Sequence, residues 1–182
     1  MDDIAAVERR AKRIRLLLLD CDGVLTDGRL MLLPDGDEQK TFHARDGHGI
    51  TLFHRAGLKT GIISGRSANV VERRARELGM AYVRQNALNK IKAFEELLTE
   101  ANLTPTECAY VGDDVVDIPI MQRVELAAAV ADATEETRQA AHYVTTHKGG
   151  RGAVREVIEL ILKAQGRWPE LMKRYIREEN KG

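Results

Sequence analysis

Four consecutive leucines that run directly into an Asp-Cys-Asp-Gly sequence constrain the fold of this chain more than any other feature. The leucines occupy positions 16–19, and Asp20, Cys21, Asp22 and Gly23 follow them. A short apolar run of this kind is typical of a strand that is buried on both faces, as in a parallel sheet. Open α/β sheets bind ligands at the carboxyl ends of their strands, where a turn at Gly23 would let both acids point at one position. Taken alone, the motif is more often a simple turn after a strand.

The rest of the chain alternates between strand-like and helix-like segments. The strand-like segments are 59–64, 80–83, 107–111 and 126–130, and the helix-like segments are 67–78, 89–101 and 115–123. This alternation predicts βαβ units and a mostly parallel sheet. We therefore expect an α/β fold of the Rossmann-like, three-layer α/β/α type. A length of 182 residues favours a single domain over residues 1–182.

Two segments interrupt the alternation. A β-hairpin is expected at about residues 29–42, just after the first strand, because a Pro-Asp-Gly-Asp turn signature occupies 34–37. Its first arm, residues 29–33, is apolar on both faces, which a free-standing flap in water should avoid, so we expect a neighbouring subunit to cover it. At the other end of the chain, a helix over 153–164 should lead into a helical tail at about 165–182.

Three acids follow the strand-like segment 107–111. They are Asp113, Asp114 and Asp117. Helix capping can account for one or two of them, but a third carboxylate in the same space would be repelled unless a cation were present. Oxygen ligands select a hard ion, and a small number of them, completed by waters, suits Mg²⁺. The segment therefore predicts a magnesium site.

Ser64 and Lys90 are placed to hold an anion at the same edge of the sheet. Ser64 ends the second strand-like segment, and Lys90 opens a helix, where a cation is unusual. Each also has a more common interpretation, since Ser64 and Ser67 could cap the following helix and Lys90 could be a solvated surface residue. Together with the acids they supply the groups that phosphoryl transfer needs: a nucleophile, a proton donor, anion-holding groups and a cation site.

In their order along the chain, the motifs D-C-D-G-V-L-T-D, I-I-S-G-R, N-K and V-G-D-D-V-V-D resemble those of the haloacid dehalogenase-like phosphohydrolases, over residues 16 to about 162. The chain is similar to capless members, which lack a large cap domain and form homotetramers with active sites near the subunit interfaces. The resemblance implies a Mg²⁺-dependent phosphatase that works through an aspartyl phosphate. It also implies a sugar-acid phosphate as substrate, first of all 3-deoxy-D-manno-octulosonate 8-phosphate, a lipopolysaccharide precursor. A nine-carbon ulosonic acid 9-phosphate is the alternative.

The resemblance also implies catalytic roles for particular residues. Asp20 would be the nucleophile and a Mg²⁺ ligand, and Asp22 the general acid and then base, with its backbone carbonyl on the metal. Ser64 and Lys90 would hold the phosphoryl group, and Asp113 would be the second side-chain ligand of Mg²⁺.

Supporting and substrate-binding roles are expected for a further set of residues. Asp117 would orient Lys90 or a metal-bound water, and Asp114 would support the same site. The candidates for substrate binding are Arg45, Asp46, Gly47, Gly65, Arg66 and Arg151. Arginines would suit the carboxylate of a sugar acid, although each of them could equally be solvated.

Composition and charge narrow the function further. Lys plus Arg and Asp plus Glu both number 28, so charge gives no reason to expect nucleic acid or an anionic membrane as a partner. No apolar run approaches the length of a membrane span, and two cysteines make no disulfide framework, so the cytoplasm is the expected compartment. A non-enzymatic structural module or a phospho-receiver is the remaining alternative. A receiver should carry an aspartate after its third strand, where this chain reads Val83-Arg84-Gln85-Asn86.

Overall fold

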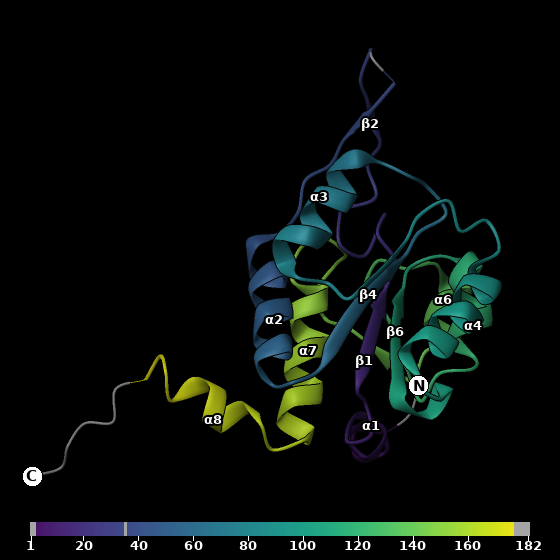
Figure 1. The fold of residues 1–182 in the computed structure, drawn as a ribbon. Coiled ribbons are helices and arrows are strands. Elements are labelled where there is room, and N and C mark those ends of the chain that lie inside the picture. Colours follow the sequence, from purple (N-terminus) through teal and green to yellow (C-terminus); the bar gives the residue numbers. More distant parts are fainter. Residues whose placement is uncertain (1–2, 35, 177–182) are drawn as a thin grey trace, which may run out of the picture.

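A parallel sheet of six strands forms the centre of the computed structural model, which describes residues 3–34 and 36–176 (Figure 1). The strands are β1 (Leu16–Leu19), β4 (Lys59–Ile63), β5 (Tyr82–Arg84), β6 (Cys108–Gly112), β7 (Leu126–Ala129) and β8 (Tyr143–Val144). They lie in the order β5-β4-β1-β6-β7-β8, and every neighbouring pair is parallel. All four leucines of β1 are buried, as expected for a central strand covered on both faces.

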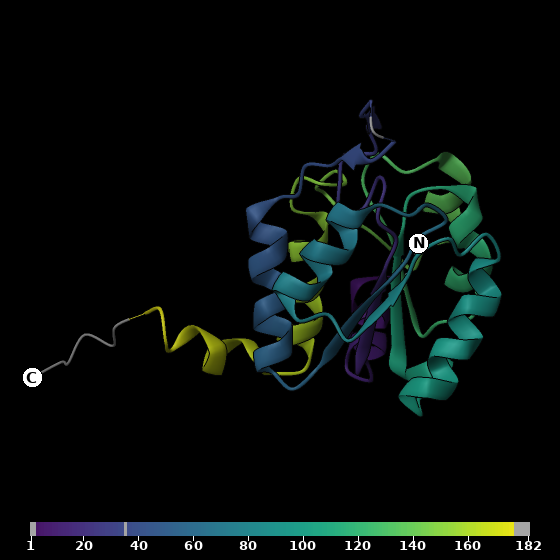
Figure 2. The ribbon, with the colours of Figure 1, turned by 45° about the horizontal axis from the view of Figure 1, so that its top comes forward.

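Helices cover both faces of this sheet. In Figure 1, α2 (Ala44–Arg55), α3 (Asn69–Leu78) and α7 (Ala153–Ala164) lie on one side of the strands, and α4 (Lys90–Ala101) and α6 (Glu135–Ala140) lie on the other. The short helix α5 (Ile118–Met121) packs beside α4, and α1 (Ile4–Ala11) packs against α7. Figure 2 shows the same two layers from a second direction. The expected three-layer α/β/α fold is therefore confirmed.

The strand order brings the ends of three strands together. From β1 the chain moves outward through β4 to β5 and then returns to the opposite side of β1 to form β6, β7 and β8. Leu19 at the end of β1 lies opposite Ile62 of β4 and Val111 of β6. The residues that follow these three strands therefore leave the sheet at one edge, beside the point where the strand order reverses.

Local signals in the sequence place most element boundaries, and a few predictions were wrong. Gly79 ends α3 in the left-handed conformation, and the Asn89 side chain caps α4 by accepting a hydrogen bond from the Lys92 amide. Ser67 does not cap α3, because the helix begins after Ala68, whose amide donates to the side chain of Gln85.

The predicted segment 115–123 is divided into a 3-10 turn, η2 (Val115–Asp117), and the short helix α5. The elements α6 and β8 were not predicted. Helix α6 has one buried residue, and β8 has two half-buried residues, so neither carries a periodic apolar pattern.

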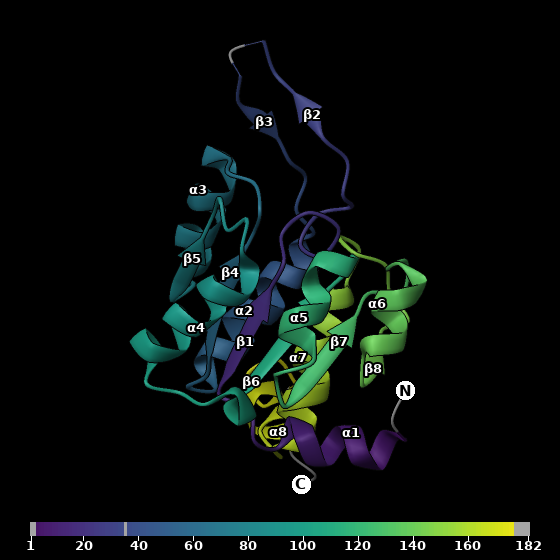
Figure 3. The same cartoon turned by 90° about the vertical axis from the view of Figure 1, so that its right-hand side faces the viewer.

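The predicted hairpin projects beyond the edge of the sheet at the carboxyl ends of the strands (Figures 1 and 3). It pairs β2 (Met31–Leu32) with β3 (Glu38–Gln39) in antiparallel register. Leu30, Met31 and Leu32 are 49%, 55% and 70% exposed, so the apolar arm finds no cover within one chain. Over residues 3–34 and 36–176, the structure contains no cap domain in addition to this hairpin.

The C-terminal segment continues from α7 into the short helix α8 (Trp168–Met172). The cationic groups of Arg155 and Lys163 lie 5.3 Å and 5.2 Å from the centre of the Trp168 ring, which anchors the beginning of the expected tail. Residues 177–182 of that tail lie outside the described residues. Among the helices that the structure describes, none combines the length and the apolar character needed to cross a membrane.

Candidate active site

Three carboxylates from two neighbouring strands gather at the carboxyl end of the sheet. Asp20 follows β1, whereas Asp113 and Asp117 follow β6, and one oxygen of each lies within 4.8 Å of the others. The Asp20 amide donates to the carbonyl of Val111 at 3.0 Å, so the parallel pairing of the two strands extends to the cluster itself. This is the clustering that the ends of adjacent parallel strands predict.

Lys90 is inserted among these acids. Its ammonium donates to Asp20 Oδ1 at 2.8 Å and to Asp117 Oδ1 at 2.7 Å, and the residue is buried at the first position of α4. A cation at a helix N-terminus opposes the helix dipole, and here the two carboxylates compensate for it. Burial alone would lower the pKa of Lys90, but the charges of Asp20 and Asp117 outweigh burial and raise that pKa. Lys90 is therefore a protonated group aimed at the cluster.

Asp117 is fully buried and already saturated by protein donors. Its Oδ1 accepts from Lys90 and from the hydroxyl of Tyr110, each at 2.7 Å. Its Oδ2 accepts from the amides of Asp113 and Asp114 at 3.0 Å and 3.4 Å. With four donors in place, Asp117 is arranged to orient Lys90 and the turn after β6. The Asp114 carboxylate turns away and accepts from the Val115 amide at 2.7 Å, where it caps η2.

The electrostatics of the cluster favour a bound cation. Burial, followed by the charge of Asp117, raises the pKa of Asp20 to about 6. Burial, followed by the charges of Asp20 and Asp117, raises the pKa of Asp113 to about 8. Within the described part of the chain, Asp113 Oδ1 is buried without a hydrogen-bond partner. A cation would reduce the repulsion between the carboxylates and would give Asp113 Oδ1 a partner. An all-oxygen donor set suits Mg²⁺.

A glycine turn brings the residues after Asp22 against the Asp113 carboxylate. Gly23 has φ +93°, and a Cβ at this position would lie 2.0 Å from Asp113 Oδ2. Gly149 packs on the outer side of the same turn, because its own Cβ would lie 1.6 Å from the Gly23 carbonyl oxygen. The glycine-rich segment before α7 is thus a close-packed wall of the turn.

The second acid of the motif is held by a residue that the sequence analysis missed. Lys40, which follows β3 in the hairpin, donates to Asp22 Oδ1 at 2.5 Å and also lies 2.7 Å from a carboxylate oxygen of Glu38. Glu38 in turn accepts hydrogen bonds from the guanidinium of Arg66. Ser64, buried at the end of β4, accepts from the Arg66 amide at 3.3 Å.

Two of the expected substrate contacts have contacts within the protein. Asp46 is buried in α2, and its carboxylate accepts from the amides of Gly152 at 3.1 Å and Arg155 at 2.8 Å, which caps the start of α7. A Cβ on Gly47 would lie 2.4 Å from the guanidinium of Arg74, so that position serves close packing. A role for Asp46 and Gly47 in substrate binding stays a prediction.

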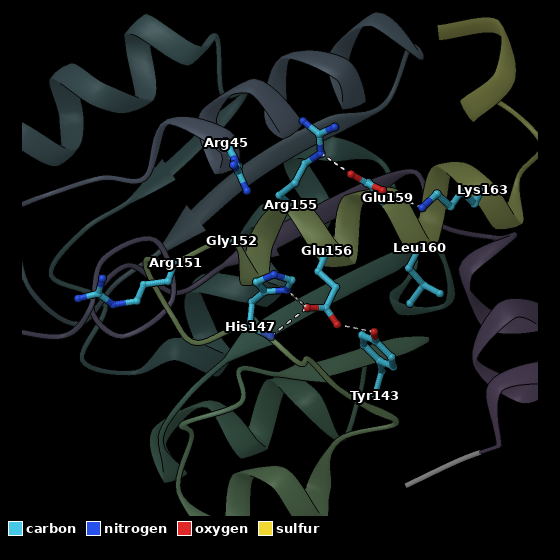
Figure 4. A pocket seen from close by; sticks show the side chains of 10 residues that line it. All are labelled: Arg45, Tyr143, His147, Arg151, Gly152, Arg155, Glu156, Glu159, Leu160 and Lys163. Carbon is cyan, nitrogen blue, oxygen red and sulfur yellow. Dashed lines mark hydrogen bonds and ion pairs between the residues drawn. The ribbon is translucent and has the colours of Figure 1, made fainter. Parts of the chain in front are cut away.

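Three of the remaining candidates, Gly65, Arg45 and Arg151, line one or the other of two cavities, whereas Arg66 is paired with Glu38. Gly65 and Lys90 line one of about 470 Å³ that adjoins the carboxylate cluster. Arg45 and Arg151 line a larger one of about 620 Å³ beside α7, to which no member of the carboxylate cluster contributes (Figure 4). In that cavity Glu156 binds the hydroxyl of Tyr143 and the His147 ring, each at 2.6 Å, as Figure 4 shows. Lys90 connects the smaller cavity to the carboxylate cluster, because it lines that cavity and donates to Asp20 and Asp117. We therefore locate the chemistry at the carboxylate cluster, beside the smaller cavity.

Comparison with known proteins places this geometry among phosphatases. Residues 80–158 match the model of the haloacid dehalogenase-like hydrolase family. The chain is 46% identical over 166 residues to the 3-deoxy-D-manno-octulosonate 8-phosphate phosphatase of Escherichia coli strain K12, and the match covers 91% of this chain and 88% of that protein.

Two solved structures share the whole fold. A probable YrbI family phosphatase from Pseudomonas syringae has a TM-score of 0.93 and 43% identity, covering 96% of this chain and 99% of the other. The 3-deoxy-D-manno-octulosonate 8-phosphate phosphatase from Moraxella catarrhalis, in complex with a magnesium ion, a phosphate ion and a KDO molecule, has a TM-score of 0.91. It is 37% identical, and the match covers 93% of this chain and 98% of that one.

Proposed function

The chain belongs to the haloacid dehalogenase-like hydrolases, and from this premise we propose that it is a Mg²⁺-dependent phosphatase of 3-deoxy-D-manno-octulosonate 8-phosphate, which it converts to KDO and phosphate. The observation that carries the proposal is the arrangement of Asp20, Asp113 and Asp117 around Lys90, at the carboxyl ends of β1 and β6. The similar proteins of Escherichia coli and Moraxella catarrhalis are phosphatases of the same sugar-acid phosphate.

Asp20 and Asp22 would carry the first half of the reaction. An oxygen of the Asp20 carboxylate attacks phosphorus, and the bond between phosphorus and the sugar oxygen breaks. Asp22 gives its proton to that oxygen, so that KDO leaves as an alcohol and Asp20 holds the phosphoryl group as an acyl phosphate. Lys90, which already donates to Asp20 Oδ1, fixes the orientation of the nucleophile and supplies positive charge beside it.

Asp22 would act again in the second half. Now ionised, it takes a proton from a water that attacks the phosphorus of the acyl phosphate. The bond between phosphorus and the Asp20 oxygen breaks, phosphate leaves, and the Asp20 carboxylate and the protonated Asp22 are regenerated. We propose that the buried hydroxyl of Ser64 and the ammonium of Lys90 hold the phosphoryl oxygens through both halves.

Asp20, Asp113 and the backbone carbonyl of Asp22 would hold Mg²⁺. The unpartnered, buried Oδ1 of Asp113 and the raised pKa values of Asp20 and Asp113 support this donor set. When bound, the ion would neutralise the acids and a phosphoryl oxygen, so that an anionic carboxylate can approach an anionic phosphate. Asp117 is left out of the donor set because four protein donors already occupy its oxygens.

A direct comparison of substrates tests the proposal. We expect kcat/KM for 3-deoxy-D-manno-octulosonate 8-phosphate to exceed that for a nine-carbon ulosonic acid 9-phosphate by about 10-fold or more. EDTA should abolish both activities, and added Mg²⁺ should restore them. A reversed preference would favour the nine-carbon alternative, and no hydrolysis of either ester would refute the phosphatase assignment. A receiver module has little support, because β5 ends at Arg84 and is followed by Gln85 rather than by an aspartate.

We extend the proposal to the assembly and setting of the chain. The uncovered apolar arm of the hairpin supports a homotetramer in which neighbouring subunits cover that arm and lie close to the active sites. Residues 1–182 are proposed to form one domain around the single six-stranded sheet, with substrate contacts from Arg66, Gly65, Arg45 and Arg151. The two free, buried cysteines are compatible with a cytoplasmic location, which cell fractionation would test.

A further inference from the structure

Lys40 is a buried cation that belongs to neither the hydrophobic core nor the carboxylate cluster. Its side chain is 1% exposed, although it comes from the arm of a hairpin that otherwise projects into solvent. Its ammonium lies between two acids, 2.5 Å from Asp22 Oδ1 and 2.7 Å from a Glu38 oxygen. A buried ammonium is costly unless charged partners lie close to it, so the two carboxylates are needed to keep Lys40 at this position.

The contact with Lys40 makes the two oxygens of Asp22 unequal. Oδ1 is occupied by the ammonium, whereas Oδ2 is buried and, among the described residues, has no hydrogen-bond partner. Fixing one oxygen of a carboxylate fixes the direction of the other. The arrangement therefore leaves Oδ2 as the atom that can exchange a proton with a leaving group or a water.

Glu38 secures Lys40 from the other side. It is 9% exposed, and its second cationic partner is the guanidinium of Arg66, which lies two residues after Ser64 at the end of β4. An unbroken chain of ion pairs thus runs from Asp22 through Lys40 and Glu38 to Arg66. Without Lys40, Asp22 would lose this cationic partner, whereas Glu38 would keep the guanidinium of Arg66.

We propose that Lys40 is a positioning residue for Asp22: the hairpin of the same chain delivers its ammonium to Oδ1 and so directs Oδ2 toward proton transfer. The inference rests on the proposed function, since it presumes that Asp22 exchanges the protons of phosphoryl transfer. It assigns the hairpin a part in the chemistry of its own subunit, independent of any role in contacts between subunits.

A merely structural role for Lys40 makes a different prediction. If the ion pairs only hold the hairpin in place, loss of Lys40 should slow phosphoryl transfer from every substrate by the same factor. If Lys40 positions the general acid, the loss should depend on the leaving group. An alkoxide must be protonated as it leaves, whereas p-nitrophenolate is stable enough to leave without a proton.

The experiment measures the transfer of the phosphoryl group to Asp20 in a single turnover of the full chain with Mg²⁺. The substrates are 3-deoxy-D-manno-octulosonate 8-phosphate and p-nitrophenyl phosphate. The variant is Lys40→Met, and the matched control is Lys92→Met, which removes a lysine of α4 whose side chain is 72% exposed. We expect Lys40→Met to slow transfer from the sugar ester by about 100-fold and from p-nitrophenyl phosphate by less than about 3-fold, with no change in Lys92→Met.

A chemical rescue shows whether a loss of activity comes from the missing ammonium or from poor folding of the variant. Lys40→Cys, alkylated with 2-bromoethylamine, regains an ammonium at nearly the same distance from the backbone. The two native cysteines are buried, and wild type treated in the same way shows whether their alkylation matters. The alkylated variant should recover transfer from the sugar ester, whereas unmodified Lys40→Cys should not.

The positioning role and the phosphatase assignment can be refuted separately. An equal loss on both substrates, no loss on either, or a fully alkylated variant without recovery on the sugar ester would overturn the positioning role while leaving the phosphatase assignment intact. A wild-type protein that transfers phosphate from neither substrate would instead refute the proposed function, and this inference with it.

Discussion

Gly23→Ala offers the sharpest test of the metal site, because the structure supplies both the magnitude of the perturbation and its control. The new Cβ would lie 2.0 Å from Asp113 Oδ2 and 2.5 Å from its Cγ, whereas ordinary van der Waals contact begins at 3.4 Å. The Asp113 carboxylate must therefore retreat by about 1.4 Å, and the backbone at φ +93° is strained as well. Magnesium holds its oxygens at about 2.0–2.1 Å and tolerates deviations of about 0.2 Å. The carboxylate cannot make that retreat and remain a ligand.

The expected result is a loss of Mg²⁺ affinity of at least about 10- to 100-fold, which is the range seen when only the support of a metal ligand is removed. Isothermal titration with MgCl₂ measures the dissociation constant, and the Mg²⁺ dependence of phosphatase activity should shift in parallel. Gly23→Ala should also lower the stability of the fold. Part of this loss comes from backbone strain, which costs about 1–3 kcal/mol for a residue with a Cβ in such a conformation.

Gly57→Ala is the matched control. Gly57 has φ +77°, and a Cβ there would meet nothing within 4 Å. This variant should show a similar loss of thermal stability from backbone strain but bind Mg²⁺ as the wild type does. If Gly23→Ala bound Mg²⁺ as tightly as Gly57→Ala, Asp113 would not be a ligand, and the argument from the raised pKa values and the unmet oxygen would fail.

Three further predictions follow from the site. Asp20→Asn should lower kcat by about 10⁴-fold or more while the circular dichroism spectrum stays that of the wild type, and near-normal turnover would reject Asp20 as the nucleophile. The folded-state pKa of Asp113 is about 8, against 3.8 when unfolded, so the folded chain binds more protons between these pH values and the metal-free protein loses stability as pH rises from about 4 to about 8. Mg²⁺ should therefore raise Tm more at pH 8 than at pH 5, and scanning calorimetry showing the opposite trend would contradict the electrostatic account. Arg66→Ala should raise KM for the sugar-acid phosphate several-fold more than KM for p-nitrophenyl phosphate, whereas equal changes would argue against contact with the sugar acid.

The central part of the site could be predicted because parallel strands share an edge. The run 16–19 and the segment 107–111 are apolar enough to be recognised as buried strands, and acids follow both. Once the two strands are neighbours, the approach of Asp20 and Asp113 needs no knowledge of side-chain packing. The apolar hairpin arm could also be recognised from the sequence, because a short hairpin with an apolar first arm would expose that arm to water.

Contacts between distant segments could not be predicted in this way. The ion pair between Lys40 and Asp22 depends on the angle at which the hairpin leaves the sheet, and no periodicity encodes that angle. The one available signal was the pair of charged residues Glu38 and Lys40, which the alternation of a strand places on the same face of the second arm. The hydrogen bonds of Asp46 are a second example, because their donors lie 106 and 109 positions away at the start of α7 and the local motif could not reveal them.

The close packing of Gly149 against Gly23 has a consequence for the synthesis of the chain. The turn that carries Asp22 is an early product of translation, but the wall that confines it is added only at residue 149 of 182. A nascent chain that stops before residue 149 would present the acids without the enclosure that holds their geometry. We expect such a fragment to bind Mg²⁺ no better than an unstructured acidic peptide, and titration of a chain ending at residue 148 would measure this. For the same reason we expect a chain that still lacks Gly149 and α7 to hydrolyse no phosphate ester.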